Sequence, residues 1–169
     1  ALAVEPDILL MDEPFSGLDP LIRRQMRIEL KKLQQTIQKT IVFITHDLDE
    51  AITVGDRIAI MRDGEVTQIG TPEEIVTSPA NSFVEEFTFD IPKTRVTSVS
   101  NIMVKPLTEE FDKRYVVTPE SSVEDMIPLV LETGDPIPVV DSKDKLVGVV
   151  PQQKILELVA QSARQEYSE

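Results

Sequence analysis

The stretch that most constrains this chain covers residues 8–19. Its first four residues are apolar, and two adjacent carboxylates, Asp12 and Glu13, follow before Pro14 ends the run. A short apolar run with such an end is typical of a buried strand in a parallel sheet. Ligands of open α/β sheets bind just beyond the carboxyl ends of these strands. Asp12 and Glu13 are therefore candidate site residues, and alternation along a strand would direct their side chains to opposite faces.

A second apolar segment, residues 40–45, is β-branched and aromatic and predicts another buried strand. It ends at His46, the only histidine of the chain. A lone histidine is more often structural than functional. His46, however, closes a buried strand at the end where Glu13 would lie on a parallel neighbour, so we also consider it a candidate site residue.

Periodicity, caps and turn residues predict the other elements of the first 90 residues. Asp47 should cap a helix, with Glu50 completing a capping box. Asp63-Gly64 should join two strands in a hairpin. The predicted helices cover residues 20–38, 48–54, a segment opened by Thr71, and 82–89, and the predicted hairpin strands cover residues 57–61 and 65–69.

Composition excludes several kinds of protein. The chain of 169 residues has no cysteine, which excludes disulfides and thiolate metal sites. No apolar run approaches the ~20 residues that span a bilayer. The net charge is -13, and acidic side chains outnumber basic ones both before and after residue 95. A face that binds nucleic acid, or one that adsorbs to an anionic membrane, is therefore disfavoured.

The strand that ends in Asp12 and Glu13 resembles the Walker B strand of ABC-type ATPases, and His46 resembles their switch histidine. The resemblance implies that Asp12 holds the Mg2+ of bound ATP through water. It implies that Glu13 polarises the attacking water and that His46 contacts the γ-phosphate, a role that suits a neutral imidazole.

Ser16-Gly17-Leu18-Asp19 resembles the D-loop of the same superfamily. The resemblance implies that Ser16, Gly17 and Asp19 belong to the nucleotide-binding site. It also implies that this segment reaches across a dimer of two ATPase subunits, with Asp19 coupling the two sites.

Further segments narrow the resemblance. Residues 46–51, 55–61 and 70–75 look like those of ABC importer ATPases, and residues 19–23 and 79–81 are most similar to the subunits that power import of quaternary amines. The resemblance implies ATP hydrolysis coupled to uptake of an osmoprotectant such as glycine betaine, proline or carnitine. It implies a second ATPase subunit, an integral-membrane permease and, indirectly, a substrate-binding protein as partners, no nucleic acid, and a peripheral place on the cytoplasmic face of the cell membrane.

The sequence has no G-x-x-x-x-G-K-[ST] phosphate loop and no Leu-Ser-Gly-Gly-Gln type of signature. We therefore expect the chain to be the C-terminal portion of a longer subunit, inactive by itself. The expected fold class is α/β: the C-terminal part of a P-loop NTPase (ABC ATPase) parallel sheet, followed by a small α+β domain.

That second domain resembles a single CBS repeat. Pro138-Val139-Val140-Asp141 and Leu146-Val147-Gly148-Val149-Val150 carry the resemblance. Ser122 and Asp125 have capping-box spacing. The predicted elements are a strand at residues 115–117, a helix after Ser122, strands at 137–140 and 146–150, and a helix at 152–163. The predicted division is an ATPase part over residues 1–90, a linker over 91–97, a CBS domain over 98–164 and a tail over 165–169.

The CBS repeat departs from the adenosine-binding members of its family at Pro151 and Lys154, where those members have Thr or Ser and then Asp. A lysine cannot accept a hydrogen bond from a ribose hydroxyl, so these residues disfavour nucleotide binding there. Residues 108–114 look like an insertion. CBS repeats pair, so a partner repeat would come from a missing segment or from another chain.

Three alternatives stay open from the sequence. The CBS repeat could be the main working part, as a sensor of ionic strength or nucleotide. It could instead be a dimerisation unit without ligand. The ATPase part could serve import of another small solute, or a process such as repair or translation, although the CBS repeat argues against the last of these.

Overall fold

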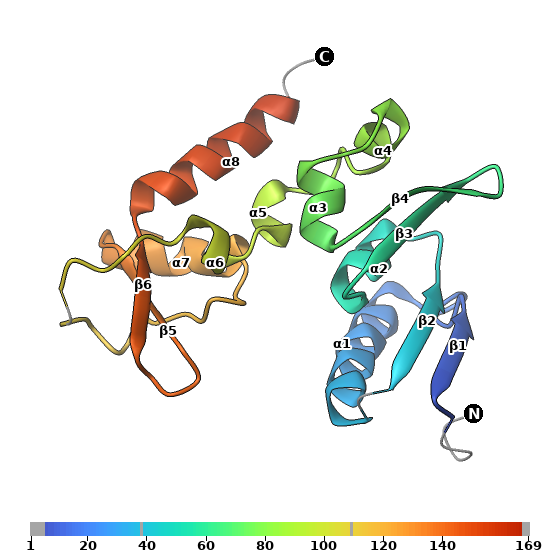
Figure 1. Ribbon diagram of the computed structural model, residues 1–169, viewed down its shortest axis with the longest axis horizontal. Coiled ribbons are helices and arrows are strands. Elements are labelled where there is room, and N and C mark those ends of the chain that lie inside the picture. Colours follow the sequence, from blue (N-terminus) through green and yellow to red (C-terminus); the bar gives the residue numbers. More distant parts are fainter. Residues whose placement is uncertain (1–5, 38, 109, 167–169) are drawn as a thin grey trace. The chain divides into compact units, whose positions relative to one another are not determined.

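The computed structural model describes residues 6–37, 39–108 and 110–166, and its chain divides into two compact units between residues 75 and 76 (Figure 1). Each unit mixes helices and strands. The first contains β1 (Ile8–Asp12), α1 (Pro20–Ile37), β2 (Thr40–Ile44), α2 (Leu48–Val54), β3 (Ile58–Arg62), β4 (Glu65–Gly70) and most of α3 (Pro72–Thr77). The second contains α4 (Ser82–Phe87), α5 (Lys93–Val96), α6 (Val99–Ile102), α7 (Val123–Thr133), β5 (Ile137–Val140), β6 (Leu146–Val150) and α8 (Gln152–Glu166).

The two predicted buried strands of the first unit pair in parallel, β1 with β2, so that Ile8 lies opposite Thr40 and Asp12 opposite Ile44. Helix α1 connects them, as a parallel pair requires. It begins and ends as predicted, except that Gln38 lies outside the described residues. Phe15, Leu30 and Val54 form the core beneath the strands. The pair brings the carboxyl ends of both strands to one edge.

The predicted hairpin is present. Strands β3 and β4 are antiparallel, and Asp63 and Gly64 between them have φ of 54° and 82°. Two consecutive positive φ values are typical of the type I′ turn, whose twist matches that of the strands. The Asp-Gly pair therefore sets the register of the hairpin locally.

The capping box predicted for α2 is only half formed. Asp47 accepts a hydrogen bond from the Glu50 amide at 3.2 Å, as expected. The Glu50 side chain does not return to the Asp47 amide, which instead donates to Thr45 Oγ1 at 3.0 Å. Glu50 is buried, only 4% exposed, and accepts from Thr45 Oγ1 at 2.7 Å. The hydroxyl of Thr45 thus takes the place that the carboxylate of a capping box would have.

The second unit has a core of nine buried apolar residues contributed by helices, strands and the loop before α7: Val99, Val117, Val123, Met126, Val130, Ile137, Val139, Val150 and Ile155. The predicted strands β5 and β6 pair antiparallel. Helix α7 begins with the predicted capping box and ends at Gly134, whose φ is 68°. Helix α8 runs to Glu166, beyond the predicted end at residue 163, and residues 167–169 of the predicted tail lie outside the described part.

The strand predicted at residues 115–117 was wrong in extent. Only Val117 forms a bridge, parallel to Val139, with its amide donating to Pro138 O at 3.1 Å. Tyr115 belongs to a turn, because its amide donates to Asp112 O. The turn removes residue 115 from the strand geometry before pairing can extend.

The predicted linker, residues 91–97, contains helix α5. This helix packs against α7 and α8, and Thr94 and Thr97 are buried. Residues 76–97 group with the second unit. Both α5 and α6 have four residues, which is too short to show helical periodicity in the sequence. The proposed limits of the ATPase part and the linker remain predictions.

We expect Met126→Ala to lower the free energy of unfolding of the second unit by about 2–5 kcal/mol, because the lost side chain leaves a cavity in the core. Met126 is fully buried on α7, whereas Leu131 on the same helix is 80% exposed. The matched control Leu131→Ala should therefore change stability by less than about 0.5 kcal/mol. Urea unfolding followed by circular dichroism measures both, and equal losses would contradict this packing.

Candidate functional site

The parallel strands bring Glu13 and His46 together, as the sequence predicts. The Glu13 amide donates to Ile44 O at 2.9 Å and so extends the β1–β2 ladder by one residue. His46 Nδ1 lies 2.9 Å from Glu13 Oε1. A carboxylate can only accept, so His46 donates from Nδ1, and its Nε2 is the nitrogen left for another partner.

Glu13 has a backbone conformation that non-glycine residues rarely adopt. Its φ is 41°, in the left-handed region. Such conformations cost of the order of 1–3 kcal/mol and persist where surrounding contacts impose them. Here the backbone of Glu13 is held at both of its polar groups: its amide donates to Ile44 O, and its carbonyl accepts from the Ser16 amide at 3.0 Å. The strained backbone directs the Glu13 side chain out of the strand geometry and toward His46.

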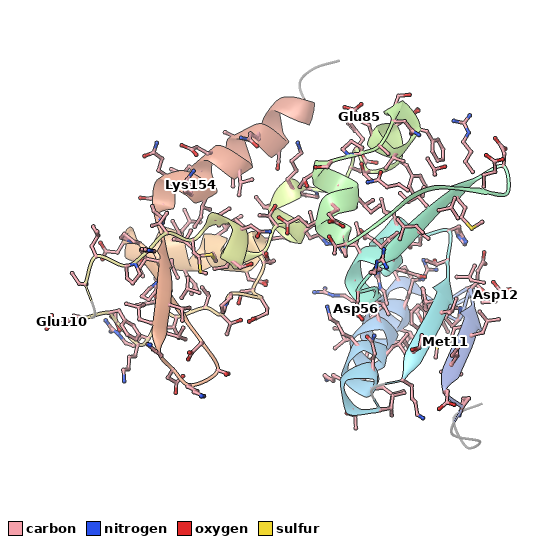
Figure 2. All side chains as sticks on the ribbon, viewed as in Figure 1. Met11, Asp12, Asp56, Glu85, Glu110 and Lys154 are labelled. Carbon is pink, nitrogen blue, oxygen red and sulfur yellow. The ribbon has the colours of Figure 1, made fainter. Side chains whose placement is uncertain are left out.

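Asp12 is exposed at the end of β1. Figure 2 shows Met11 and Asp12 on either side of this strand, and Met11 packs against the core of Phe15, Leu30 and Val54. No hydrogen bond to the Asp12 carboxylate is found among the described residues, so the group is available to a ligand.

The electrostatics of the site favour a charged histidine. The hydrogen bond from His46 to Glu13, followed by the charge of Glu13, raises the pKa of His46 above its ordinary value of 6.5, with smaller contributions from Asp47 and Glu50. The protonated imidazole therefore persists to higher pH than in a free histidine. The sequence analysis expected a neutral imidazole. His46 reaches that form when the pH rises through its raised pKa.

The segment 16–19 forms the turn between β1 and α1. Gly17 has φ of 79°, with open space where a Cβ would stand, so its positive φ and not crowding favours glycine. Asp19 Oδ1 accepts from the amides of Leu21 and Ile22, both at 3.1 Å, and so caps α1. Among the predicted site residues, Glu13 and His46 contact each other, Ser16 joins them through its backbone, and Asp19 serves as a helix cap.

The sequence did not single out Arg23, which lies next to this turn. Its Nη2 donates to Leu18 O at 3.1 Å. Its guanidinium also lies 3.8 Å from Asp47 Oδ2 and 3.9 Å from Glu50 Oε1. In the sequence, Arg23 entered only as part of residues 19–23, which narrow the resemblance, and no role was assigned to it. Its place four residues after the cap Asp19, one helical turn along α1, is the signal that could have pointed to it.

The described residues fit the metal side of a bound Mg2+–ATP complex. Mg2+ prefers oxygen ligands and keeps several of its waters. The exposed Asp12 carboxylate matches that preference, whereas no group of three or more His, Cys, Asp or Glu side chains able to hold a metal directly is found among residues 6–37, 39–108 and 110–166. A single exposed carboxylate is a group that could bind a metal that keeps most of its waters. Within the same described ranges, no helix is long and apolar enough to span a membrane.

We expect Glu13→Gln to lower the pKa of His46 toward its ordinary value, because the amide carries no charge. The single histidine makes its proton NMR titration unambiguous. Since Glu13 raises the folded-state pKa of His46, its contribution to stability should be complete below pH 6.5 and should be lost as the pH rises through the raised pKa. Glu65→Gln, an exposed acid on β4, is the control. An unchanged midpoint in Glu13→Gln would show that the two side chains do not interact in solution.

Comparison with known proteins gives a family for part of the second unit. The CBS domain family matches residues 99–161. This agrees with the α+β unit described above and confirms the predicted CBS repeat.

Relatives match much of the whole chain. The trimethylamine N-oxide transport system ATP-binding protein TmoW of Pelagibacter ubique is 45% identical over 94% of this chain and 46% of its own length. The glycine betaine/carnitine transport ATP-binding protein GbuA of Listeria monocytogenes is 56% identical over 67% of this chain and 28% of its own. ProV of Escherichia coli, the ATP-binding protein of a glycine betaine/proline betaine transport system, is 60% identical over 60% of this chain and 26% of its own.

The chain spans less than half the length of these relatives. Among solved structures, cbiO1 of Clostridium perfringens, described as part of the ABC transporter complex cbiONQ, is 29% identical, with a TM-score of 0.42 over 56% of this chain and 37% of that one. The sequence relatives and the parallel β1–β2 pair agree with the predicted fold class. The chain is thus a homologue of the ATP-binding subunits of ABC transporters for glycine betaine and related solutes, and it contains a CBS domain.

Proposed function

We propose that this chain belongs to the ATP-hydrolysing subunit of an ABC importer for a quaternary-amine osmoprotectant such as glycine betaine, proline or carnitine. The observation that carries the proposal is the 2.9 Å hydrogen bond between His46 and Glu13 at the carboxyl ends of two parallel strands. The strands were predicted separately, and their pairing brings together the acid and the histidine that the resemblance assigns to one reaction.

In the proposed mechanism, bound Mg2+–ATP supplies the phosphoryl group that is transferred to water. Glu13 is the group that accepts a proton from this water, since its Oε1 is engaged by His46 and its Oε2 remains for the nucleophile. His46 fixes the carboxylate and presents Nε2 toward an anionic group. Asp12 would hold the metal through water. Phosphoryl transfer needs mainly such positioning and charge stabilisation.

The phosphate cradle would come from outside these residues. No G-x-x-x-x-G-K-[ST] motif occurs in the 169 residues, and the relatives are more than twice as long as the part they share with this chain. Ser16, Gly17 and Asp19 would meet the nucleotide of a second ATPase subunit across a dimer. The Asp19 carboxylate caps α1 at the same time.

The proposed partners follow from the relatives, which are ATP-binding proteins of transport systems. They are a second ATPase subunit, an integral-membrane permease and, through the permease, a substrate-binding protein. The subunit would lie peripherally on the cytoplasmic face of the cell membrane.

The CBS domain supports a second, regulatory function. Lys154 stands where adenosine-binding members carry an aspartate, and its Nζ lies 3.9 Å from Glu157 on the exposed side of α8. A cation at this place cannot accept from a ribose hydroxyl. The domain would therefore regulate the ATPase as a salt-responsive or dimerising unit rather than as an adenosine sensor.

We expect Glu13→Gln in the full-length subunit to lower ATP turnover by a factor of about 100 or more, since the amide cannot accept the proton of the attacking water. Nucleotide should still bind and remain trapped. Steady-state phosphate release and retention of labelled ATP measure the two effects. With Glu65→Gln as control, near-normal turnover in Glu13→Gln would remove Glu13 from the proposed reaction.

We also expect ATP hydrolysis by the full-length subunit with its permease in vesicles to rise with glycine betaine and with ionic strength. Screening by salt acts on exposed charges, and the chain carries a net charge of -13. The measurement is a salt series with and without solute. A hydrolysis rate that does not change with solute would contradict the proposed substrate class. A rate that does not change with salt would contradict the salt-responsive role of the CBS domain.

A further inference from the structure

We infer that Arg23 is a positioning residue that ties the turn at residues 16–19 to the backbone on both sides of His46, and so holds His46 against Glu13. This inference rests on the proposed function of Glu13 and His46, and it assigns to that site a residue of α1 that contacts neither of them.

Arg23 first contacts the turn at residues 16–19. Arg23 Nη2 donates to Leu18 O at 3.1 Å, within the segment that connects Glu13 to α1. The backbone of this segment is bonded to Glu13 in turn, because the Ser16 amide donates to Glu13 O at 3.0 Å. Arg23 therefore fixes the part of the chain that leaves the acid.

Arg23 also contacts two acidic side chains that follow His46 in the chain. The Arg23 guanidinium lies 3.8 Å from Asp47 Oδ2 and 3.9 Å from Glu50 Oε1. Glu50 accepts from Thr45 Oγ1 at 2.7 Å, and the same oxygen accepts from the Asp47 amide at 3.0 Å. Thr45 and Asp47 are the two neighbours of His46, so the network holds the backbone on both of its sides.

Burial of Glu50 explains why this network needs Arg23. Glu50 is only 4% exposed, and a buried carboxylate needs a cation or hydrogen-bond donors to remain charged. Arg23 is the cation that faces it. Arg23 Nε is buried and has no hydrogen-bond partner among the described residues, and its distance of 3.9 Å to Glu50 Oε1 is too long for a hydrogen bond. The contact between Arg23 and Glu50 is therefore an ion pair without a direct hydrogen bond.

The histidine depends on such support because its own side chain has little. The His46 side chain is 79% exposed, and among the described residues its one side-chain hydrogen bond is the bond to Glu13. Its position is therefore set mainly by the backbone that Thr45 and Asp47 fix. A displacement of about 1 Å at a catalytic group can cost a factor of about 100 in rate.

The test compares Arg23→Gln with Arg24→Gln in the full-length subunit. Arg24 is the exposed neighbour on the same helix, and no hydrogen bond or ion pair of its side chain is found in the described part of the chain. We expect Arg23→Gln to lower kcat by about tenfold or more with little change in the KM for ATP, the pattern of an interaction used in the transition state. Arg23→Lys keeps the charge but lacks the planar guanidinium, so its kcat should lie between those of the wild type and Arg23→Gln. Arg24→Gln should resemble the wild type.

A double-mutant cycle separates positioning from general loss of stability. Glu50→Gln should lower kcat in the same way, and Arg23→Gln/Glu50→Gln should be no worse than Arg23→Gln alone, since both act through one network. Effects on kcat that multiply, or losses that follow the thermal midpoint and appear equally in KM, would overturn the inference.

The outcomes for the two proposals are distinct. An active wild type, an inactive Glu13→Gln and an Arg23→Gln that matches Arg24→Gln overturn the role of Arg23 and leave the proposed function standing. No hydrolysis by the wild type, or unchanged hydrolysis by Glu13→Gln, overturns the proposed function.

NMR of this chain tests, without an activity assay, whether Arg23 links the turn at residues 16–19 to His46. Arg23→Gln should shift both the Asp19 amide, whose peptide group includes the Leu18 carbonyl, and the ring protons of His46. Arg24→Gln should shift neither. An Arg23→Gln spectrum in which the His46 signals stay in place overturns the inference, whatever the enzyme assays show.

Discussion

The parallel pairing of β1 with β2 is the interaction on which the site depends. Its register places Asp12 opposite Ile44, so the residues just beyond, Glu13 and His46, leave the sheet at the same edge. A shift of one residue would turn every strand side chain to the other face. The core side chains Met11 and Phe43 would then lose their packing, so burial of the apolar face and proximity of the two polar groups are fixed together.

Local chemistry explains what the sequence could predict. Strands with apolar runs, the Asp-Gly hairpin and the capping box at Ser122 all depend on residues a few positions apart. The proximity of Glu13 and His46 was also predictable, although 33 positions separate them, because parallel strands end at one edge. Only the pairing of the two strands had to be assumed.

What the sequence could not show depends on contacts between elements. Glu50 has the spacing of a capping box, yet its carboxylate turns inward because Thr45 donates to it and Arg23 lies beside it. Arg23 looks like one of several basic residues on an exposed helix. Its role appears only when α1 and α2 are packed, since its partners come from the turn before α1 and from the segment around His46. The strand expected at 115–117 shortened for a similar reason, because a local turn competes with pairing.

The burial pattern of β1 and β2 gives an argument for the fold class that is independent of any motif. Leu9, Met11, Ile41 and Phe43 face inward, yet the outward positions are also largely apolar, with Leu10 66% and Ile44 47% exposed. A sheet with one solvent-exposed face would carry polar residues at those outward positions. Strands of α/β sheets that are covered by helices on both faces are apolar on both faces. Helix α1 lies on the inward face only (Figure 1). The composition of the strands is therefore that of a sheet with two covered faces, the architecture that places catalytic carboxylates at strand ends.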